Sequence, residues 1–161
     1  MTNTDQVDDG PTERFRLARA ADLLGGRKVL HTYPKSPLEA HEMLLRGLPP
    51  KALMHFVDSF VVLHWDAALE KAIGMSQRTY QRYSAATDKR LSLEQAARAW
   101  KLAIVIARAT DVLGSRKEAE QWLERPAIGL DERRPIDLLA TPAGVELVEN
   151  YLERIDHGVY A

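Results

Sequence analysis

Helix-start and helix-stop signals follow one another along the whole sequence. Ser36-Pro37-Leu38-Glu39 and Ser92-Leu93-Glu94-Gln95 have the capping-box pattern, in which a serine and an acidic or amide side chain satisfy free N–H groups of a first turn. Glycines close several apolar stripes, as expected where a helix stops. No run alternates apolar and polar residues over five or more positions, as a half-buried strand would. The sequence therefore predicts an all-α fold.

The apolar stripes between these signals give the expected helices and their order. They lie at residues 13–24, 36–47, 50–60, 65–73, 76–83, 93–113, 115–123, 135–139 and 142–158. We expect three regions: a disordered N-terminus at 1–12, a helical region at 13–90 and a C-terminal helical domain at 91–161.

Composition limits the class of protein. The 161 residues are 45% hydrophobic, with a formal net charge of −1 and no cysteine, so disulfide scaffolds and thiolate metal sites are excluded. The N-terminus lacks the basic and apolar regions of a signal peptide, and no apolar run approaches the ~20 residues that span a bilayer. We expect a cytoplasmic protein without a membrane partner.

Residues 66–83 have the pattern of a helix-turn-helix. An amphipathic helix ends at Gly74, Met75 is placed to fill the space between two helices, and Ser76 is placed to cap the second helix. Tyr80 and Tyr83 would point inward. The remaining face would present arginine and glutamine, which read guanine and adenine edges.

We expect the flanking cations to hold phosphates, which fixes register rather than sequence. The candidate DNA-binding residues are Lys71, Ser76, Gln77, Arg78, Thr79, Gln81, Arg82, Lys89 and Arg90. The same pattern fits a helical hairpin with a solvated Gln/Arg face, because helix-turn-helix spacing is degenerate.

No constellation indicates catalysis or a cofactor. The five histidines lack metal-binding spacing, and the sequence has neither a nucleophile elbow nor a glycine-rich phosphate loop. The carboxylates Glu118, Glu120 and Glu124 are expected along an exposed helix face. We therefore expect neither an enzyme nor a bound cofactor or metal.

The C-terminal half resembles the toxin-binding domain of Xre/MbcA/ParS antitoxins. The residues that carry the resemblance are Ala119-Glu-Gln-Trp-Leu-Glu-Arg-Pro126, Arg134-Pro-Ile-Asp-Leu-Leu-Ala-Thr141, Gly144, Val148 and Arg154-Ile-Asp-His-Gly-Val-Tyr-Ala161. The resemblance extends back to about Leu48 and includes the helix-turn-helix. Two departures are His157, where an aromatic residue is expected, and Ala140, where an acidic residue is common.

The resemblance implies an antitoxin of a type II toxin–antitoxin system. Such a protein binds a RES-type toxin, which degrades NAD, obstructs the toxin's active site, and commonly represses its own operon as a dimer within a toxin–antitoxin complex. The implied partners are a cognate RES-type toxin, operator DNA and a second copy of the chain.

The end of the last helix combines aromatic, arginine and apolar residues of the kind that anchor interfaces. The candidate toxin-binding residues are Tyr151, Arg154, Ile155, His157, Gly158, Val159, Tyr160 and Ala161. The alternative is a dimeric helix-turn-helix repressor without a toxin, whose C-terminal half serves dimerisation alone.

Overall fold

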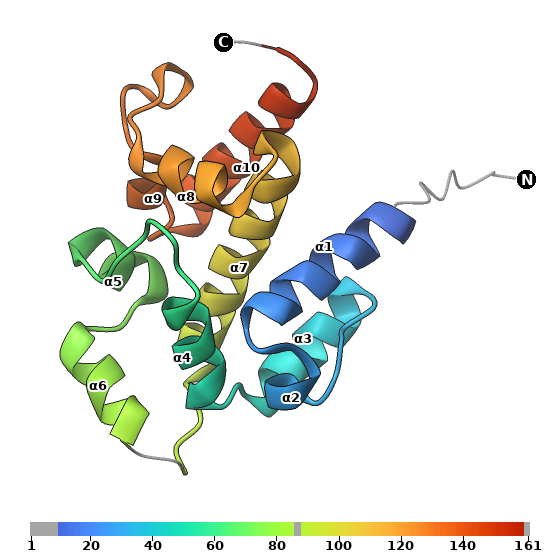
Figure 1. Ribbon diagram of the computed structural model, residues 1–161, viewed down its shortest axis with the longest axis vertical. Coiled ribbons are helices and arrows are strands. Elements are labelled where there is room, and N and C mark those ends of the chain that lie inside the picture. The colour runs from blue at the N-terminus through green and yellow to red at the C-terminus, as the bar shows by residue number, and fades with distance from the viewer. Residues whose placement is uncertain (1–9, 86–87, 160–161) are drawn as a thin grey trace, which may run out of the picture.

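The computed structural model describes residues 10–85 and 88–159, and these fold into an all-α molecule (Figure 1). The all-α prediction is confirmed, since an isolated bridge between Ala127 and Arg133 is the one β-type pairing found within those ranges. The elements are α1 (Gly10–Leu23), α2 (Gly26–Leu30), α3 (Pro37–Arg46), α4 (Pro50–Asp58), α5 (Ala67–Ile73), α6 (Gln77–Ala85), α7 (Leu93–Leu113), α8 (Arg116–Glu124), η1 (Ile128–Leu130), α9 (Pro135–Leu138) and α10 (Pro142–Asp156).

The long helix α7 forms the centre of the molecule (Figure 1). It packs against α1, α3, α5, α8 and α10. Its buried positions include many alanines beside Leu102, Val105 and Ile106, and these small side chains let neighbouring helices approach closely. Trp100 is buried in this core, whereas Ile104 is only partly buried. One apolar core therefore extends from α1 to α10.

The predicted caps Ser36 and Ser92 are present, and side-chain caps also begin α5, α8 and α10. Ser36, Asp66, Ser92, Ser115 and Thr141 each accept a hydrogen bond from the backbone N–H three residues later. At Ser92 both halves of the capping box are present, because the Gln95 side chain also accepts from the Ser92 N–H at 3.1 Å. These signals are local in sequence, so the sequence alone locates them well.

The N-terminal region differs from the expectation in two places. Helix α1 begins at Gly10, so residues 10–12 are helical rather than disordered; residues 1–9 lie outside the described residues. Gly25, with φ at +98°, does stop α1, but a short helix, α2, follows at once. The sequence predicts a helix over residues 13–24 and the next over 36–47, so α2 was not predicted.

Candidate functional site

The predicted helix-turn-helix is present as α5 and α6. Gly74 closes α5 in the left-handed conformation, with φ at +72°, and Met75 is 4% exposed between the two helices. The Ser76 side chain accepts from the Thr79 N–H at 3.1 Å at the start of α6. The turn thus has the glycine, the buried methionine and the serine cap that the sequence predicts.

The Glu70 carboxylate fixes the start of α6, although Glu70 was not among the predicted site residues. Glu70 Oε1 on α5 accepts from the Gln77 N–H at 2.8 Å and from the Trp65 indole N–H at 3.3 Å. The Trp65 ring stacks on Tyr80, with ring centroids 4.5 Å apart, and burial followed by the charge of Asp58 raises the pKa of Tyr80. The two tyrosines expected inward, Tyr80 and Tyr83, are both partly buried.

The outer face of α6 is free for binding. The side chains of Gln77, Arg78, Gln81 and Arg82 are exposed and make no hydrogen bond or ion pair with the described residues. The sequence of α6 contains no acidic residue. The structure therefore leaves these four side chains available to reach a groove of DNA, as the helix-turn-helix pattern requires.

The other predicted DNA-binding residues differ from one another in their hydrogen bonding. Lys71 and Lys89 are exposed, whereas Ser76 and Thr79 bond to each other at 3.0 Å within the cap. The Arg90 guanidinium donates to the carbonyl of Gly47 at 2.9 Å, so part of its role is to join two loops.

The predicted toxin-binding residues lie at the opposite end of the molecule, where α10 meets η1 (Figure 1). Tyr151 stacks on Trp122, with ring centroids 6.0 Å apart, and the Arg154 guanidinium lies 5.4 Å from the centre of the Tyr151 ring. A Cβ atom on Gly129 would come within 2.4 Å of the Tyr151 ring, so the loop touches α10 closely. Tyr151, Arg154 and Ile155 are thus partly buried and held in place.

The chain leaves α10 through a Schellman motif. Gly158 has φ at +70°, its N–H donates to the Ile155 carbonyl at 3.0 Å, and the Val159 N–H donates to the Arg154 carbonyl at 2.8 Å. His157, Gly158 and Val159 are exposed. Tyr160 and Ala161, which were also predicted to bind the toxin, lie outside the described residues.

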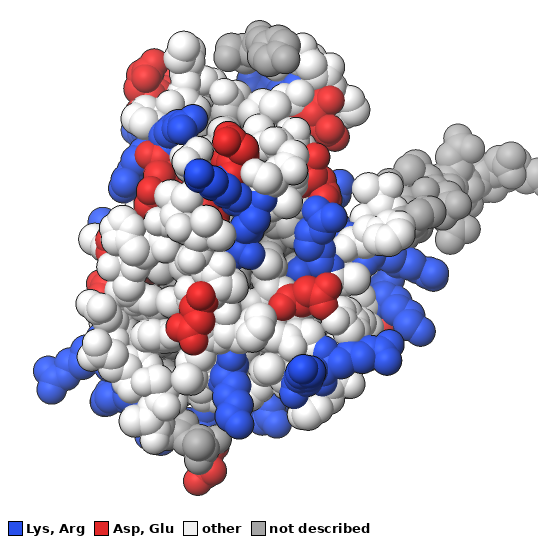
Figure 2. Space-filling model, in the orientation of Figure 1, with Lys and Arg blue, Asp and Glu red and all other residues white. Residues whose placement is uncertain are grey.

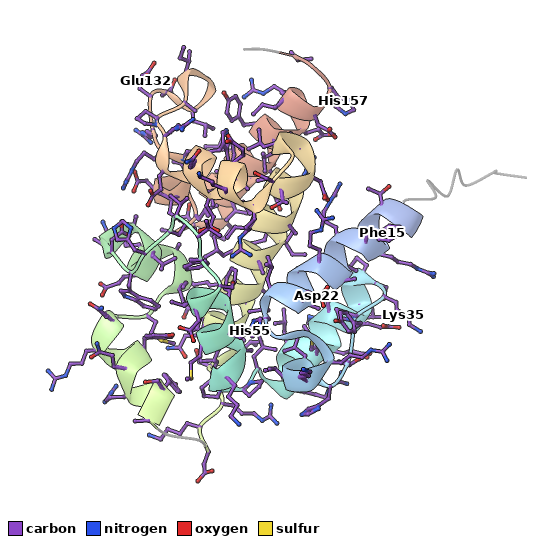
Figure 3. The ribbon with its side chains drawn as sticks, viewed as in Figure 1. Phe15, Asp22, Lys35, His55, Glu132 and His157 are labelled. Carbon is purple, nitrogen blue, oxygen red and sulfur yellow. The ribbon has the colours of Figure 1, made fainter. Side chains whose placement is uncertain are left out.

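An exposed isoleucine stands beside this end and was not predicted as a site residue. Ile128 in η1 is 77% exposed, and Val159 is 53% exposed. The loop that carries Ile128 also holds Asp131 and Glu132 at positive φ, and Figure 3 shows Glu132 and His157 at the same end of the molecule. Isolated exposed apolar residues are common. Ile128 is a candidate site residue only because it lies beside the predicted C-terminal residues.

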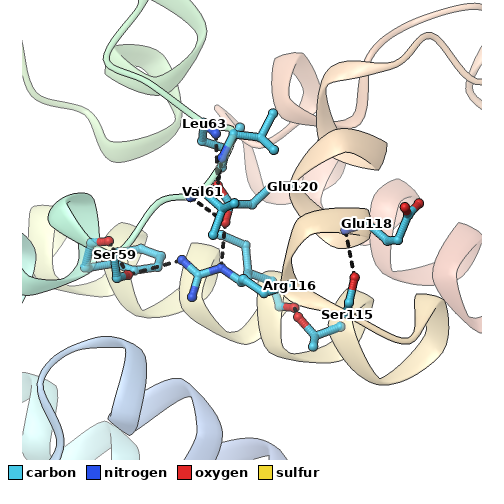
Figure 4. Close-up of polar contacts among 11 residues, drawn as sticks. Ser59, Val61, Leu63, Ser115, Arg116, Glu118 and Glu120 are labelled. Atoms are coloured by element: carbon cyan, nitrogen blue, oxygen red, sulfur yellow. Dashed lines mark hydrogen bonds and ion pairs between the residues drawn. The ribbon is translucent and has the colours of Figure 1, made fainter.

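Glu120 corrects the expectation that the carboxylates of α8 line an exposed face. Its side chain is 0% exposed, and it accepts from the N–H groups of Val61, Val62 and Leu63 at 2.9 to 3.1 Å (Figure 4). The Arg116 Nε atom lies 2.9 Å from Glu120 Oε2 in an ion pair. Burial lowers the pKa of Arg116, and the charge of Glu120 opposes that shift. This cluster joins α8 to the segment before α5.

Comparison with known proteins identifies both halves of the chain. A family model described as the antitoxin Xre-like helix-turn-helix domain matches residues 39–103. A second, described as the antitoxin Xre/MbcA/ParS C-terminal toxin-binding domain, matches residues 108–158. The chain belongs to the Xre/MbcA/ParS antitoxin family.

Two curated relatives of this Xre/MbcA/ParS-family chain carry the name Antitoxin Xre. The protein from Photorhabdus laumondii is 31% identical over 87 residues, which cover 53% of this chain and 58% of the relative. The protein from Yersinia enterocolitica is 31% identical over 96 residues, which cover 59% of this chain and 64% of the relative. The matches thus span about three fifths of each relative's length.

The family assignment fits the geometry of the Xre/MbcA/ParS-family chain. The helix-turn-helix match runs from α3 into α7, and the C-terminal match contains Glu120, η1 and α10. The two matches meet in α7, which packs against helices of both. Over the described ranges, no helix is long and apolar enough to cross a membrane.

Proposed function

We propose that this protein is the antitoxin of a type II toxin–antitoxin pair, whose C-terminal domain binds a RES-type, NAD-degrading toxin and covers the toxin's active site. We also propose that it works in the cytoplasm as a homodimer within the toxin–antitoxin complex, without enzymatic activity of its own. Family membership and the name of the two relatives support the antitoxin assignment. The choice of a RES-type toxin rests on the resemblance of the C-terminal segments.

The surface where α10 meets η1 carries the toxin part of the proposal. It combines a fixed aromatic and arginine pair, Tyr151 and Arg154, with the exposed apolar side chains of Ile128 and Val159. Aromatic and arginine side chains that are already held in place lose little conformational entropy on binding, which favours them as interface anchors. Val159, which is exposed beyond Gly158, can then contact a concave site.

The toxin surface can be tested by co-expression with the protein encoded by the adjoining gene, followed by affinity purification. We expect Ile128→Asp to lose most of the co-purified partner, because a charge replaces an exposed apolar contact without disturbing the core. Leu38→Asp, at a 66% exposed leucine on α3, is the matched control and should retain the partner. Equal recovery with both variants would remove Ile128 from the surface. A wild-type chain that captures nothing would favour the alternative, a dimeric repressor without a toxin.

The free outer face of α6 carries the DNA part of the proposal: operator binding by which the protein represses its own operon. We expect Arg78→Ala and Arg82→Ala each to weaken binding to a duplex from the protein's own promoter by about 1–3 kcal/mol, if each contacts a base. Fluorescence anisotropy measures this directly. Unchanged affinity in both variants would remove α6 as the recognition helix.

A further inference from the structure

A basic hollow lies between the N-terminal helices and the end of α6. It has a volume of about 500 Å³ and is bordered by α2, the turn from α3 to α4, the first turns of α4 and the last turn of α6. Among the described residues, four cationic side chains line it and no carboxylate does. They are Lys28, Arg46, Lys51 and Arg90.

Three of these cations have no carboxylate partner among the described residues. Lys28, Arg46 and Lys51 are exposed and form no ion pair within the described residues. Elsewhere arginines and lysines on this molecule do pair, as in Lys101 with Glu149 at 2.7 Å. Uncompensated positive charge around a concave surface raises the local concentration of anions.

The fourth cation shapes the hollow. Arg90 donates to the Gly47 carbonyl at 2.9 Å, and its side chain lies so close to Gly47 that a Cβ there would come within 3.2 Å of Arg90 Cδ. The Leu91 N–H also donates to the Leu48 carbonyl at 3.0 Å. The segment after α6 is therefore fixed to the turn before α4, which keeps the lining cations together.

The hollow borders the proposed recognition face. Tyr83 and Ser84 in the last turn of α6 line it, and Ser84 lies three residues after Gln81. Residues three and four apart share a helix face, so Ser84 is on the same side of α6 as Gln77 and Gln81. Figure 2 shows Lys and Arg side chains following the lower edge of the molecule, from the side of α6 toward that of α2 and α3.

We propose that this hollow binds the phosphate backbone of the DNA duplex whose major groove takes α6. The inference rests on the proposed DNA binding and adds a second, sequence-independent contact to it. Because the sugar–phosphate backbones of the DNA flank the major groove, a helix in the groove has phosphates beside its end. Lys28 lies before the segment that matches the helix-turn-helix family model, so α2 extends the DNA surface beyond that domain.

The experiment uses the full chain and two labelled duplexes of equal length, one from the protein's own promoter and one with the same bases shuffled. The variant is Lys28→Ala/Arg46→Ala/Lys51→Ala. The matched control, Lys117→Ala/Arg125→Ala/Arg133→Ala, removes the same charge from exposed positions of the other half of the chain. Affinity is measured over a range of salt concentrations, and circular dichroism checks that both variants fold.

We expect the hollow variant to lose affinity on the order of ten-fold for both duplexes. The negative slope of log K against log salt should become shallower by about 2 to 3. Its preference for the promoter duplex should persist, and the control should match the wild type. A hollow variant with an unchanged salt slope would overturn the inference, while a loss of preference in Arg78→Ala would still support α6. A wild-type chain that binds neither duplex would overturn the proposed DNA binding and this inference together.

Discussion

The Glu120 carboxylate receives hydrogen bonds from three consecutive backbone N–H groups and pairs with Arg116. The donors belong to the segment between α4 and α5, and within the described residues these three N–H groups have no other hydrogen-bond acceptor. A buried carboxylate is stable only when such donors replace its lost water. Glu120 thus links α8 to the segment before α5, in addition to the shared core.

We expect Glu120→Ala to lower the free energy of unfolding by about 3–5 kcal/mol, because it leaves the partly buried Arg116 and three N–H groups without their acceptor. Urea denaturation followed by circular dichroism measures the change. Glu118→Ala on the same helix, at an exposed position, should stay within about 1 kcal/mol of the wild type. Similar losses in both variants would show that Glu120 has no special role.

The spacing of the apolar residues in α8 indicates that Glu120 is buried. The prediction missed this because it treated Glu118, Glu120 and Glu124 as one exposed cluster. Glu120 follows Ala119 and precedes Leu123 by three residues, so it shares their buried face of α8. Its donors lie 57 to 59 residues earlier in the chain, and no local pattern announces them. The exposed positions Arg78 and Arg82 were predictable, because their neighbours Tyr80 and Tyr83 define the inward side of a short amphipathic helix.

At the scale of elements, α6 stands out because none of its residues is buried. Its position depends on the Glu70 carboxylate at its first N–H, the stack of Trp65 on Tyr80, and its contacts with α4. A helix held by few contacts opens locally at low cost, so each of these contacts affects the shape of the proposed DNA-binding face.

We expect Glu70→Ala to speed hydrogen exchange of the amides at the start of α6 by about ten-fold, which corresponds to a lost hydrogen bond to a charged group. Glu70→Gln keeps an acceptor oxygen and should retain much of the protection. Promoter binding should weaken in the same order. If both variants exchange at the wild-type rate, Glu70 does not position α6.

Some of the helices could be predicted from the sequence and others could not. The helices that begin at Ser92 and Thr141 were predictable, since cap and apolar stripe agree within a few residues. The five-residue helix α2 was not, because it is too short to show a period, and it is held by tertiary contacts of Leu30 with the core.

At the scale of the whole molecule, the two proposed surfaces lie at opposite ends of one body. Helix α6 and the basic hollow form one end, and η1 with the end of α10 forms the other, while α7 extends between them (Figure 1). The shared core means that neither end is on a flexible tether. The two proposed surfaces therefore share no residue, and the proposal implies that a toxin and DNA can be bound at the same time.

The most direct test of the antitoxin assignment is a growth assay with the protein encoded by the adjoining gene. That protein should arrest growth when expressed alone and be harmless beside the full chain. A chain that lacks residues 158–161 should protect less, while it still binds its promoter duplex with wild-type affinity. If the neighbour is harmless alone, the antitoxin assignment is contradicted. If the shortened chain protects fully, the tail is not part of the toxin-binding surface.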